Sequence, residues 1–392
     1  MRLFLSDHLL RDVVGHHLGY NLALAEAACR SSIEPILVTH LDFDPSLAEG
    51  NQVKQIFRTD YRANPPAWIA KNHHFLTLLE KWCDYRFGYD LSRFPTVCSS
   101  DLVFAQMVAP RHFLKWLRWM SSLAEPPVLF LHLGYRPGRF TSFEITRSIK
   151  KLTDLLRQKI YFVTDSEKLV APFTQAMGST VHYLPHIISY AIPAPEAERK
   201  AKPITVFVPG NARREKGFVE AVEAAAQILL SPRREEFHFV IQCHKPDTVC
   251  SEFLRVHQST LEGIEWIDRP LSNEEYLQQL TQSDILLLPY HLDCYEMRTS
   301  GIFTEARVAG KPVITTTQSW AGDRVAHQGG GWIVKERSVE DLVDTLLAVP
   351  LQLAEKREEA LSEVSAAKAE FHRDTFMKRL LALIPKEKYG IF

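Results

Sequence analysis

Short apolar runs alternate with longer segments of helical periodicity along the whole chain. The segment 15–30 has the helical pattern, because Leu18, Leu22, Ala25 and Cys29 fall on one side of a helix. Strands are predicted at 2–7, 34–40, 128–132 and 159–165. This alternation is typical of βαβ units, so we expect a parallel sheet with helices on both faces.

The segment 66–124 departs from the alternation. It is long, helical and rich in aromatic residues, and no strand is evident in it. We therefore expect an inserted helical region that lies over the sheet.

A break in the pattern separates two similar halves. Residues 185–203 contain four prolines and a charge cluster but no apolar periodicity, which is typical of a linker. The prediction is a first domain at 1–190, a linker at 191–203 and a second doubly wound domain at 204–370. The segment 371–392 contains an amphipathic helix, which we expect to pack back on the first domain.

The second domain repeats the alternation more regularly than the first. Two such domains joined by a linker predict a cleft, and ligands of these sheets bind at the carboxyl ends of the strands. Helices are predicted at 217–230, at 273–282 and after Ser300, and strands at 204–210, 237–243, 263–269, 284–290, 311–317 and 331–335.

Composition supports a two-domain globular enzyme. The chain has 392 residues, of which 46% are hydrophobic and 24% charged, and this length exceeds what one core usually holds. The charged start MRLFLSDHLL lacks the apolar core of a signal peptide, so a cytoplasmic protein is expected. The six cysteines form no CxxC pair, which argues against a disulfide framework and a zinc site.

The charge is nearly balanced overall but uneven along the chain. A net charge of -1 argues against general nucleic-acid binding. Residues 1–195 carry 21 Lys and Arg against 17 Asp and Glu, hence +4, and the remainder carries 25 against 30, hence -5. The first half is therefore the one we expect to meet an anionic surface or substrate.

Two segments of the second domain have features of a phosphate site. Ser300 and Gly301 precede a helical pattern, and the N–H groups at a helix start bind anions, while Glu305 lies one turn further on. The loop GNARREKG at 210–217 places three cations directly after the domain's first strand. The alternatives are a glutamate that offsets the helix dipole and a solvated basic turn.

The order of these segments resembles the retaining nucleotide-sugar glycosyltransferases of family 4. GNARREKG stands where that family has Gly-Arg-x-x-x-Glu-Lys-Gly, and MRTSGIFTEARVAGKPVI at 297–314 corresponds to its Glu-x7-Glu element. The segments 163–188 and 264–290 occur in the family's order, so the resemblance covers most of 125–345. It implies the GT-B fold: α/β, with two doubly wound Rossmann-like domains that face across a cleft, the first on the acceptor side.

The resemblance also implies the reaction. It implies a hexosyltransferase that moves a sugar from a nucleoside diphosphate sugar, of UDP or GDP, to an acceptor hydroxyl with retention, without metal or cofactor. The base would lie against the loop after 264–270. The residues assigned to this reaction are His132, Lys216, Arg213 and Glu305 for catalysis, and Gly210, Asn211, Arg214, Arg298, Thr299, Ser300, Gly301 and Ile302 for the donor. On the acceptor side we expect Gly15, His16 and His17, because this loop follows the first strand at its ligand-facing end, where Asp7 is placed to orient one of the histidines.

This chain departs from the family pattern at two positions. The first glutamate of the pair is Met297 here, with Glu296 one residue out of register, and the arginine after the glycine is Asn211. We expect Arg213 or Arg214 to supply the missing cation and Arg298 to contact the donor in place of the lost acid.

Several alternatives stay open from the residues alone. Asp42 and Asp44 could hold a metal or could be loop and capping acids. The basic aromatic segment 111–120 could lie on the inner membrane face near a lipid-linked acceptor, or pack against its own domain. Saccharide and small-molecule acceptors are equally compatible, and a nucleotide-sugar 2-epimerase or a nucleotide-sugar binding protein are the competing functions.

Overall fold

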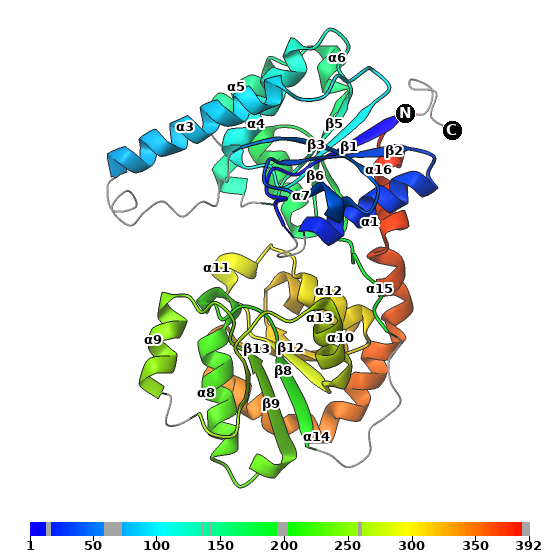
Figure 1. Ribbon diagram of the computed structural model, residues 1–392. Coiled ribbons are helices and arrows are strands. Elements are labelled where there is room, and N and C mark those ends of the chain that lie inside the picture. Colours follow the sequence, from blue (N-terminus) through cyan, green and yellow to red (C-terminus); the bar gives the residue numbers. More distant parts are fainter. Residues whose placement is uncertain are drawn as a thin grey trace. The chain divides into compact units, whose positions relative to one another are not determined.

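The computed structural model contains two compact units (Figure 1). The first comprises Met1–Tyr190 and His372–Phe392, and the second comprises Ala191–Phe371. The structure describes residues 1–12, 17–58, 73–134, 137–140, 143–193, 203–257 and 261–385.

Unit 1 is built on a seven-stranded parallel sheet in the order β3-β2-β1-β4-β5-β6-β7. Its strands are β1 (Arg2–Ser6), β2 (Glu34–His40), β3 (Gln52–Phe57), β4 (Leu102–Ala105), β5 (Val128–His132), β6 (Ile160–Thr164) and β7 (Val181–Tyr183). Its described helices are α1 (His17–Arg30), η1 (Pro45–Ala48), α3 (His73–Ser92), α4 (Pro110–Ser122), η2 (Pro137–Phe140), α5 (Phe143–Lys150), α6 (Asp154–Arg157), α7 (Glu167–Met177) and α16 (Arg373–Ala382).

The expectation that 66–124 contains no strand is wrong. β4 lies between β1 and β5, with Leu102 paired to Leu3 on one side and to Val128 on the other. Its four residues are all buried, and such a short apolar run gives no period by which to distinguish it from a helix. Helices α3 and α4 are therefore the crossovers on either side of β4 rather than an insertion over the sheet. The sequence pattern also did not predict β3.

The strand order reverses between β1 and β4. Loops that leave neighbouring strands at such a point run to opposite faces of the sheet and leave a crevice between them, where ligands of these folds bind. Asp7 follows β1 directly and Gln106 follows β4, so both lie at the carboxyl edge of the sheet at the reversal.

Helix α16 completes one side of the unit 1 core. The core cluster joins strand residues such as Phe104 with α1 residues such as Leu24 and with Phe376 and Leu380 of α16. At the surface Arg30 of α1 donates to Asp374 at 3.0 Å. The last described helix of the chain thus belongs to the unit that contains the first strand.

Unit 2 contains a six-stranded parallel sheet in the order β10-β9-β8-β11-β12-β13, and each strand overlaps a predicted one. The strands are β8 (Ile204–Val208), β9 (Phe237–Gln242), β10 (Glu265–Ile267), β11 (Ile285–Leu288), β12 (Val313–Thr316) and β13 (Gly331–Val334). The described helices are η3 (Arg214–Lys216), α8 (Phe218–Leu229), η4 (Arg234–Glu236), α9 (Thr248–His257), α10 (Asn273–Gln282), α11 (Leu292–Tyr295), α12 (Gly301–Val308), α13 (Trp320–Gln328), α14 (Val339–Ser362) and α15 (Val364–Glu370).

Serine caps fix where the helices of unit 2 begin. Ser272 and Glu275 form a capping box at the start of α10, and Ser300 and Ser319 accept from backbone N–H groups at the starts of α12 and α13. The strand order reverses between β8 and β11, so the loops after these two strands lie at the predicted ligand edge. Among the described helices, none has both the length and the apolar character needed to cross a membrane.

Candidate functional site

The turn after β8 folds a lysine onto a glycine. Gly210 has φ +100°, and a Cβ on it would overlap Nζ of Lys216 and lie 3.2 Å from Cδ1 of Ile302. The Gly210 N–H donates to Oε1 of Gln242 at 2.7 Å, which fixes the turn to β9. The structure thus brings Gly210 and Lys216 together with the first turn of α12, although Ile302 lies 86 positions after Lys216 in the sequence.

Burial lowers the pKa of Lys216 to about 8. Arg213 and Arg298 lower this pKa further, while Glu215 and Glu305 act in the opposite direction. Four charged groups therefore change the pKa of this one ammonium. Two of them lie in the turn after β8, and the other two lie in α12 and the loop before it.

The start of α12 is held by two tyrosines. Ser300 is the N-cap of the helix, because its Oγ accepts from the Phe303 N–H at 3.2 Å. The same Oγ shares a hydrogen bond with the Tyr290 hydroxyl at 2.8 Å. Tyr290 stacks on Tyr295 at 4.1 Å between centroids, and the exposed guanidinium of Arg298 lies 5.4 Å from the Tyr295 ring. The first N–H groups of a helix have no intrahelical acceptor, which leaves those of Gly301 and Ile302 for an anion.

Glu305 is oriented by a residue that the sequence analysis missed. The hydroxyl of Tyr276, in α10, donates to Oε2 of Glu305 at 2.6 Å. Glu305 itself is half-buried, one turn inside α12. No local pattern marks Tyr276, because it is one aromatic residue on an amphipathic helix and its partner is 29 positions away.

Two contacts connect the basic turn to the loop before α12. Gly217 has φ +69°, and a Cβ there would overlap the Pro289 carbonyl, so the two backbones touch. Buried His291 shares a hydrogen bond with Oε1 of Glu220 at 2.9 Å and donates its backbone N–H to the Glu215 carbonyl at 3.0 Å. Burial favours a raised pKa for Glu220, but the hydrogen bond with His291, the backbone hydrogen bond of Glu220 and the charges of His291 and Arg337 together lower the pKa. The sequence analysis identified neither contact.

A hollow beside β10 lies next to the Gly210 turn. It has a volume of about 270 Å³ and is lined by Trp266 and Arg269, among others. Gln242 joins the two places, because its Oε1 accepts from Gly210 while its Nε2 donates to the Arg269 carbonyl at 3.2 Å. This is the loop against which the base is expected to lie.

The other predicted donor residues lie on the same turn and loop. Arg213 and Arg214 are exposed, the first with Glu215 at 3.6 Å and the second donating its backbone N–H to Asp247 at 2.7 Å. Asn211 forms a β-bridge with His244. Thr299 is half-buried between Arg298 and the cap, and its role, like those of the other predicted residues, stays a prediction.

In unit 1 a buried polar network lies at the reversal of the strand order. His17 Nδ1 lies 2.8 Å from Oδ2 of Asp7, which also accepts from Asn21 at 3.1 Å, and Asn21 accepts from Gln106 at 2.6 Å. Burial would raise the pKa of Asp7, but His17, His8 and the hydrogen bond from the Leu9 N–H together lower it. Gly15 and His16 lie outside the described residues.

His132 ends β5 with its ring buried. Among the described residues its Nδ1 has no hydrogen-bond partner, and the ring stacks near Phe104 at 6.0 Å between centroids. Burial lowers the pKa of His132, which Asp165 and Asp7 only partly offset, so the ring is neutral at pH 7. An unpaired buried nitrogen is costly and is a candidate for a ligand's hydrogen bond.

The acid pair after β2 has structural partners. Asp44 is the N-cap of η1 and accepts from the Ser46 N–H at 2.9 Å, which lowers the pKa of Asp44. Asp42 is exposed and lies 3.9 Å from Arg11. Within the described part of the chain, no group of three or more His, Cys, Asp or Glu side chains is placed to hold a metal ion.

The aromatic side chains of 111–120 pack inside unit 1. Phe113, Trp116, Leu117 and Trp119 of α4 are buried. They face β-strands and α3 rather than solvent, which is the alternative of packing against its own domain. Its amphipathic pattern is that of a helix covering a sheet.

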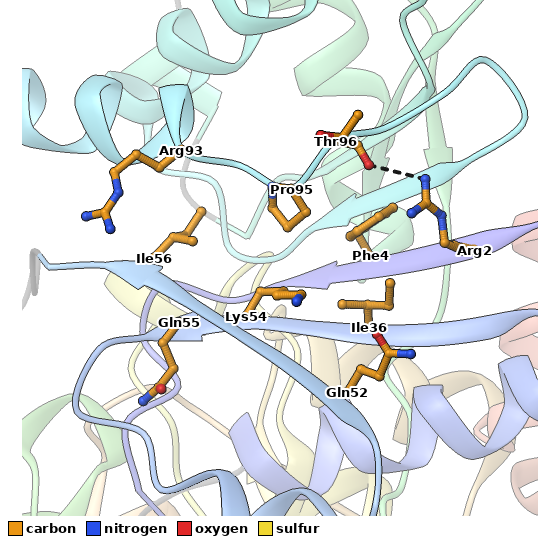
Figure 2. A pocket seen from close by; sticks show the side chains of 10 residues that line it. All are labelled: Arg2, Phe4, Ile36, Gln52, Lys54, Gln55, Ile56, Arg93, Pro95 and Thr96. Carbon is orange, nitrogen blue, oxygen red and sulfur yellow. Dashed lines mark hydrogen bonds between the residues drawn. The ribbon is translucent and has the colours of Figure 1, made fainter.

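A larger hollow lies elsewhere in unit 1, over β1, β2 and β3. It has a volume of about 440 Å³, and Figure 2 shows Arg2, Lys54 and Arg93 among its lining side chains. Arg2 is neutralised by Asp101 and donates to the Thr96 carbonyl at 3.2 Å. The hollow contains none of the predicted site residues and lies on a sheet face rather than at the carboxyl edge.

Comparison with known families finds a match within unit 2. Residues 202–349 match the family of glycosyl transferases group 1. This match covers the basic turn, the loop before α12 and Glu305, and it supports a glycosyltransferase. No curated protein sequence matches the chain.

Solved structures share the fold over nearly the whole chain. Sucrose-phosphate synthase from Thermosynechococcus elongatus is similar at TM-score 0.67 and 14% identity, with 98% of each chain covered. Trehalose-6-phosphate synthase OtsA is similar at TM-score 0.67 and 11% identity, with 97% of this chain and 98% of that one covered. HepE from Anabaena, in complex with UDP and glucose, is similar at TM-score 0.62 and 12% identity, with 97% and 98% covered. The α/β fold is that of GT-B glycosyltransferases.

Proposed function

We propose that this protein transfers a sugar from a UDP-sugar to an acceptor hydroxyl with retention of configuration. The observation that carries the proposal is the ammonium of Lys216, held against Gly210 at the first turn of α12, with Glu305 one turn further on. A cation, helix N–H groups and a carboxylate in that order match the diphosphate and the ribose of a nucleotide sugar.

The donor would lie along the edge of the unit 2 sheet. Its phosphates would accept from Lys216 and from the N–H groups of Gly301 and Ile302, with Arg213 as an additional cation. Glu305, oriented by Tyr276, would accept from ribose hydroxyls. The hollow beside β10 supports a place for the base, and the UDP bound to HepE supports uracil.

The proposed reaction breaks the bond between the sugar and the diphosphate. The acceptor oxygen forms its bond to the anomeric carbon on the face that the diphosphate leaves, and a phosphate oxygen takes the acceptor's proton. Lys216 and the helix N–H groups stabilise the charge that develops on the diphosphate, which is worth about 10²-fold in rate for each well-placed donor. The resemblance to family 4 supports retention and a reaction without metal, and product configuration by NMR together with activity in EDTA tests both.

Thermal stabilisation by nucleotides tests the donor site directly. We expect UDP, among UDP, GDP, ADP and TDP, to stabilise the protein by about 2.7 kcal/mol at a hundredfold excess over its dissociation constant. Glu305→Ala should lose this stabilisation. Glu296→Ala is the matched control, because Glu296 is exposed on the same loop and out of register.

The outcomes separate the competing functions. Stabilisation by none of the four nucleotides would contradict a donor site in unit 2. Stabilisation without turnover of the sugar donor, above background, would identify a nucleotide-sugar binding protein, and conversion of donor without an acceptor would favour the epimerase.

Arg298 is proposed to replace the glutamate missing at Met297. Its electrostatic effect on Lys216 supports a position near the proposed diphosphate. We expect Arg298→Ala to lower donor turnover by at least about tenfold, as for loss of a charge-assisted contact. Arg234→Ala, an exposed arginine paired with Glu235, is the control, and unchanged turnover in Arg298→Ala would exclude the role.

A further inference from the structure

Helix α3 of unit 1 exposes a continuous apolar stripe to solvent. Phe75, Leu78, Trp82, Tyr85 and Tyr89 are between 49% and 70% exposed. They recur every three or four residues, so at 3.6 residues per turn they fall within a stripe about 80° wide. An extended row of large exposed apolar side chains is unusual on the surface of a monomer and indicates a binding surface.

The opposite side of α3 anchors the helix to its unit. Phe87 is buried and stacks on His112 at 3.8 Å and on Phe57 at 5.5 Å, and Leu91 is buried near it. Lys115 of α4 lies against Gly88. In Figure 1 the first half of α3 extends beyond the sheet of unit 1. The stripe therefore points away from the core on a helix that is fixed at its second half.

Cations flank the stripe on both sides. The guanidinium of Arg86 lies 4.6 Å from the Trp82 ring and that of Arg58 lies 5.8 Å from the Tyr89 ring. Helix α3 has the carboxylates Glu80, Asp84 and Asp90, of which Asp84 is half-buried and Asp90 fully buried, and α4 has none. The cations on these two helices are Lys81, Arg86, Arg111, Lys115 and Arg118.

We propose that this stripe seats unit 1 on a membrane surface that contains anionic lipids. Trp and Tyr at the apolar face with Lys and Arg beside them are what an interfacial helix requires, because the rings enter the headgroup region while the cations meet lipid phosphates. The excess of cations over exposed carboxylates gives the charge complementarity to anionic headgroups. The inference does not depend on the proposed sugar transfer, and it moves the membrane contact from α4 to α3.

Vesicle flotation tests the proposal with the full chain. We expect the protein to float with vesicles of phosphatidylcholine and phosphatidylglycerol, and to float much less with pure phosphatidylcholine or at high salt. The double variant Trp82→Ser with Tyr85→Ser should bind at least about tenfold more weakly. Lys81→Glu with Arg86→Glu should lose the preference for the anionic vesicles.

The controls keep a folding defect apart from a binding defect. Leu351→Ser removes another exposed apolar side chain, 87% exposed on α14, and should leave flotation unchanged. The thermal unfolding of the α3 variants should match that of the wild type. Absence of flotation with anionic vesicles would overturn the proposal, as would a concentration-dependent dimer that the Trp82 and Tyr85 substitutions dissociate, since the stripe would then join two copies of this chain.

Discussion

At the scale of single residues, the environment of Lys216 determines what the site can bind. The ammonium can lie against the backbone only because residue 210 is glycine, and burial lowers the pKa of Lys216 to about 8. A partly desolvated cation interacts strongly with an anion that replaces the surrounding water. The nearby cations Arg213 and Arg298 oppose its protonation, and a bound diphosphate would relieve that opposition.

This environment predicts a pH dependence of donor binding. Lys216 is cationic below its pKa and neutral above it, so UDP affinity should fall as the pH rises through about 8, by about tenfold per pH unit at most. Bound diphosphate favours the ammonium, so the pKa should be higher in the complex. Titration calorimetry with UDP between about pH 7 and about pH 9.5 measures the fall in affinity. The pKa at which activity is lost on the basic side should be higher in the pH profile of kcat, which reports the complex, than in that of kcat/KM, which reports the free enzyme.

Two substitutions at the same position provide the control. Lys216→Arg keeps its charge over this range and should lose the basic limb while retaining affinity. Lys216→Met should bind UDP weakly at every pH. A basic limb that persists in both variants would assign the titration to another group.

At the scale of elements, the site depends on one turn being locked to one loop. The contact of Gly217 with the Pro289 carbonyl and the hydrogen bond between His291 and Glu220 hold the basic turn against the segment that leads into α12. The backbone contact and the buried pair of His291 and Glu220 therefore position the groups proposed to bind the ligand in both the turn and the loop.

Substitution of Gly217 tests this lock. A left-handed φ costs a residue other than glycine about 1 kcal/mol, and at Gly217 the overlap with Pro289 adds to it. We expect Gly217→Ala to destabilise unit 2 by more than about 2 kcal/mol and to weaken UDP binding. Gly178→Ala is the matched control, since Gly178 has φ +63° with nothing near a Cβ, and it should show only the smaller loss of stability. Equal effects in the two variants would exclude the lock.

At the scale of the whole molecule, the end of the chain is part of the core of its beginning. Phe376 of α16 meets the rings of Phe104 and Tyr20 edge-on, at 5.7 Å and 6.3 Å between centroids. Phe104 in turn lies beside His132, and Tyr20 beside His186. Unit 1 therefore requires residues from both ends of the chain.

Removal of this ring should destabilise unit 1. We expect Phe376→Ala to lower the free energy of unfolding by about 3–5 kcal/mol, because it leaves a cavity among buried rings. Lys378→Ala, exposed on the same helix, should change it by less than about 0.5 kcal/mol. Chemical denaturation followed by a unit 1 signal measures both, and a loss below about 1 kcal/mol for Phe376→Ala would show that α16 contributes little to the fold.

The regularity of each unit decided how much of the fold could be predicted. The strands of unit 2 are apolar runs separated by turn residues, and all six were predicted. In unit 1, β4 is four apolar residues between two long helices, and β3 at the sheet edge has the sequence QVKQIF without regular alternation, so neither gave a distinct period. Short central strands are recognised by their neighbours in the sheet, and those neighbours are remote in the sequence.

The sequence by itself determined two α/β units of alternating strands and helices and the segments that carry the proposed donor site, because strand-to-helix turns, glycines and helix caps are local features; the GT-B fold was implied by the family resemblance. Only the tertiary structure decided that Tyr276 orients Glu305 and that His291 binds Glu220, since these partners are far apart along the chain. It also decided that the aromatic residues of α4 are buried while those of α3 are exposed. Periodicity defines an apolar face of a helix, but only the packing of the other elements determines whether that face is covered.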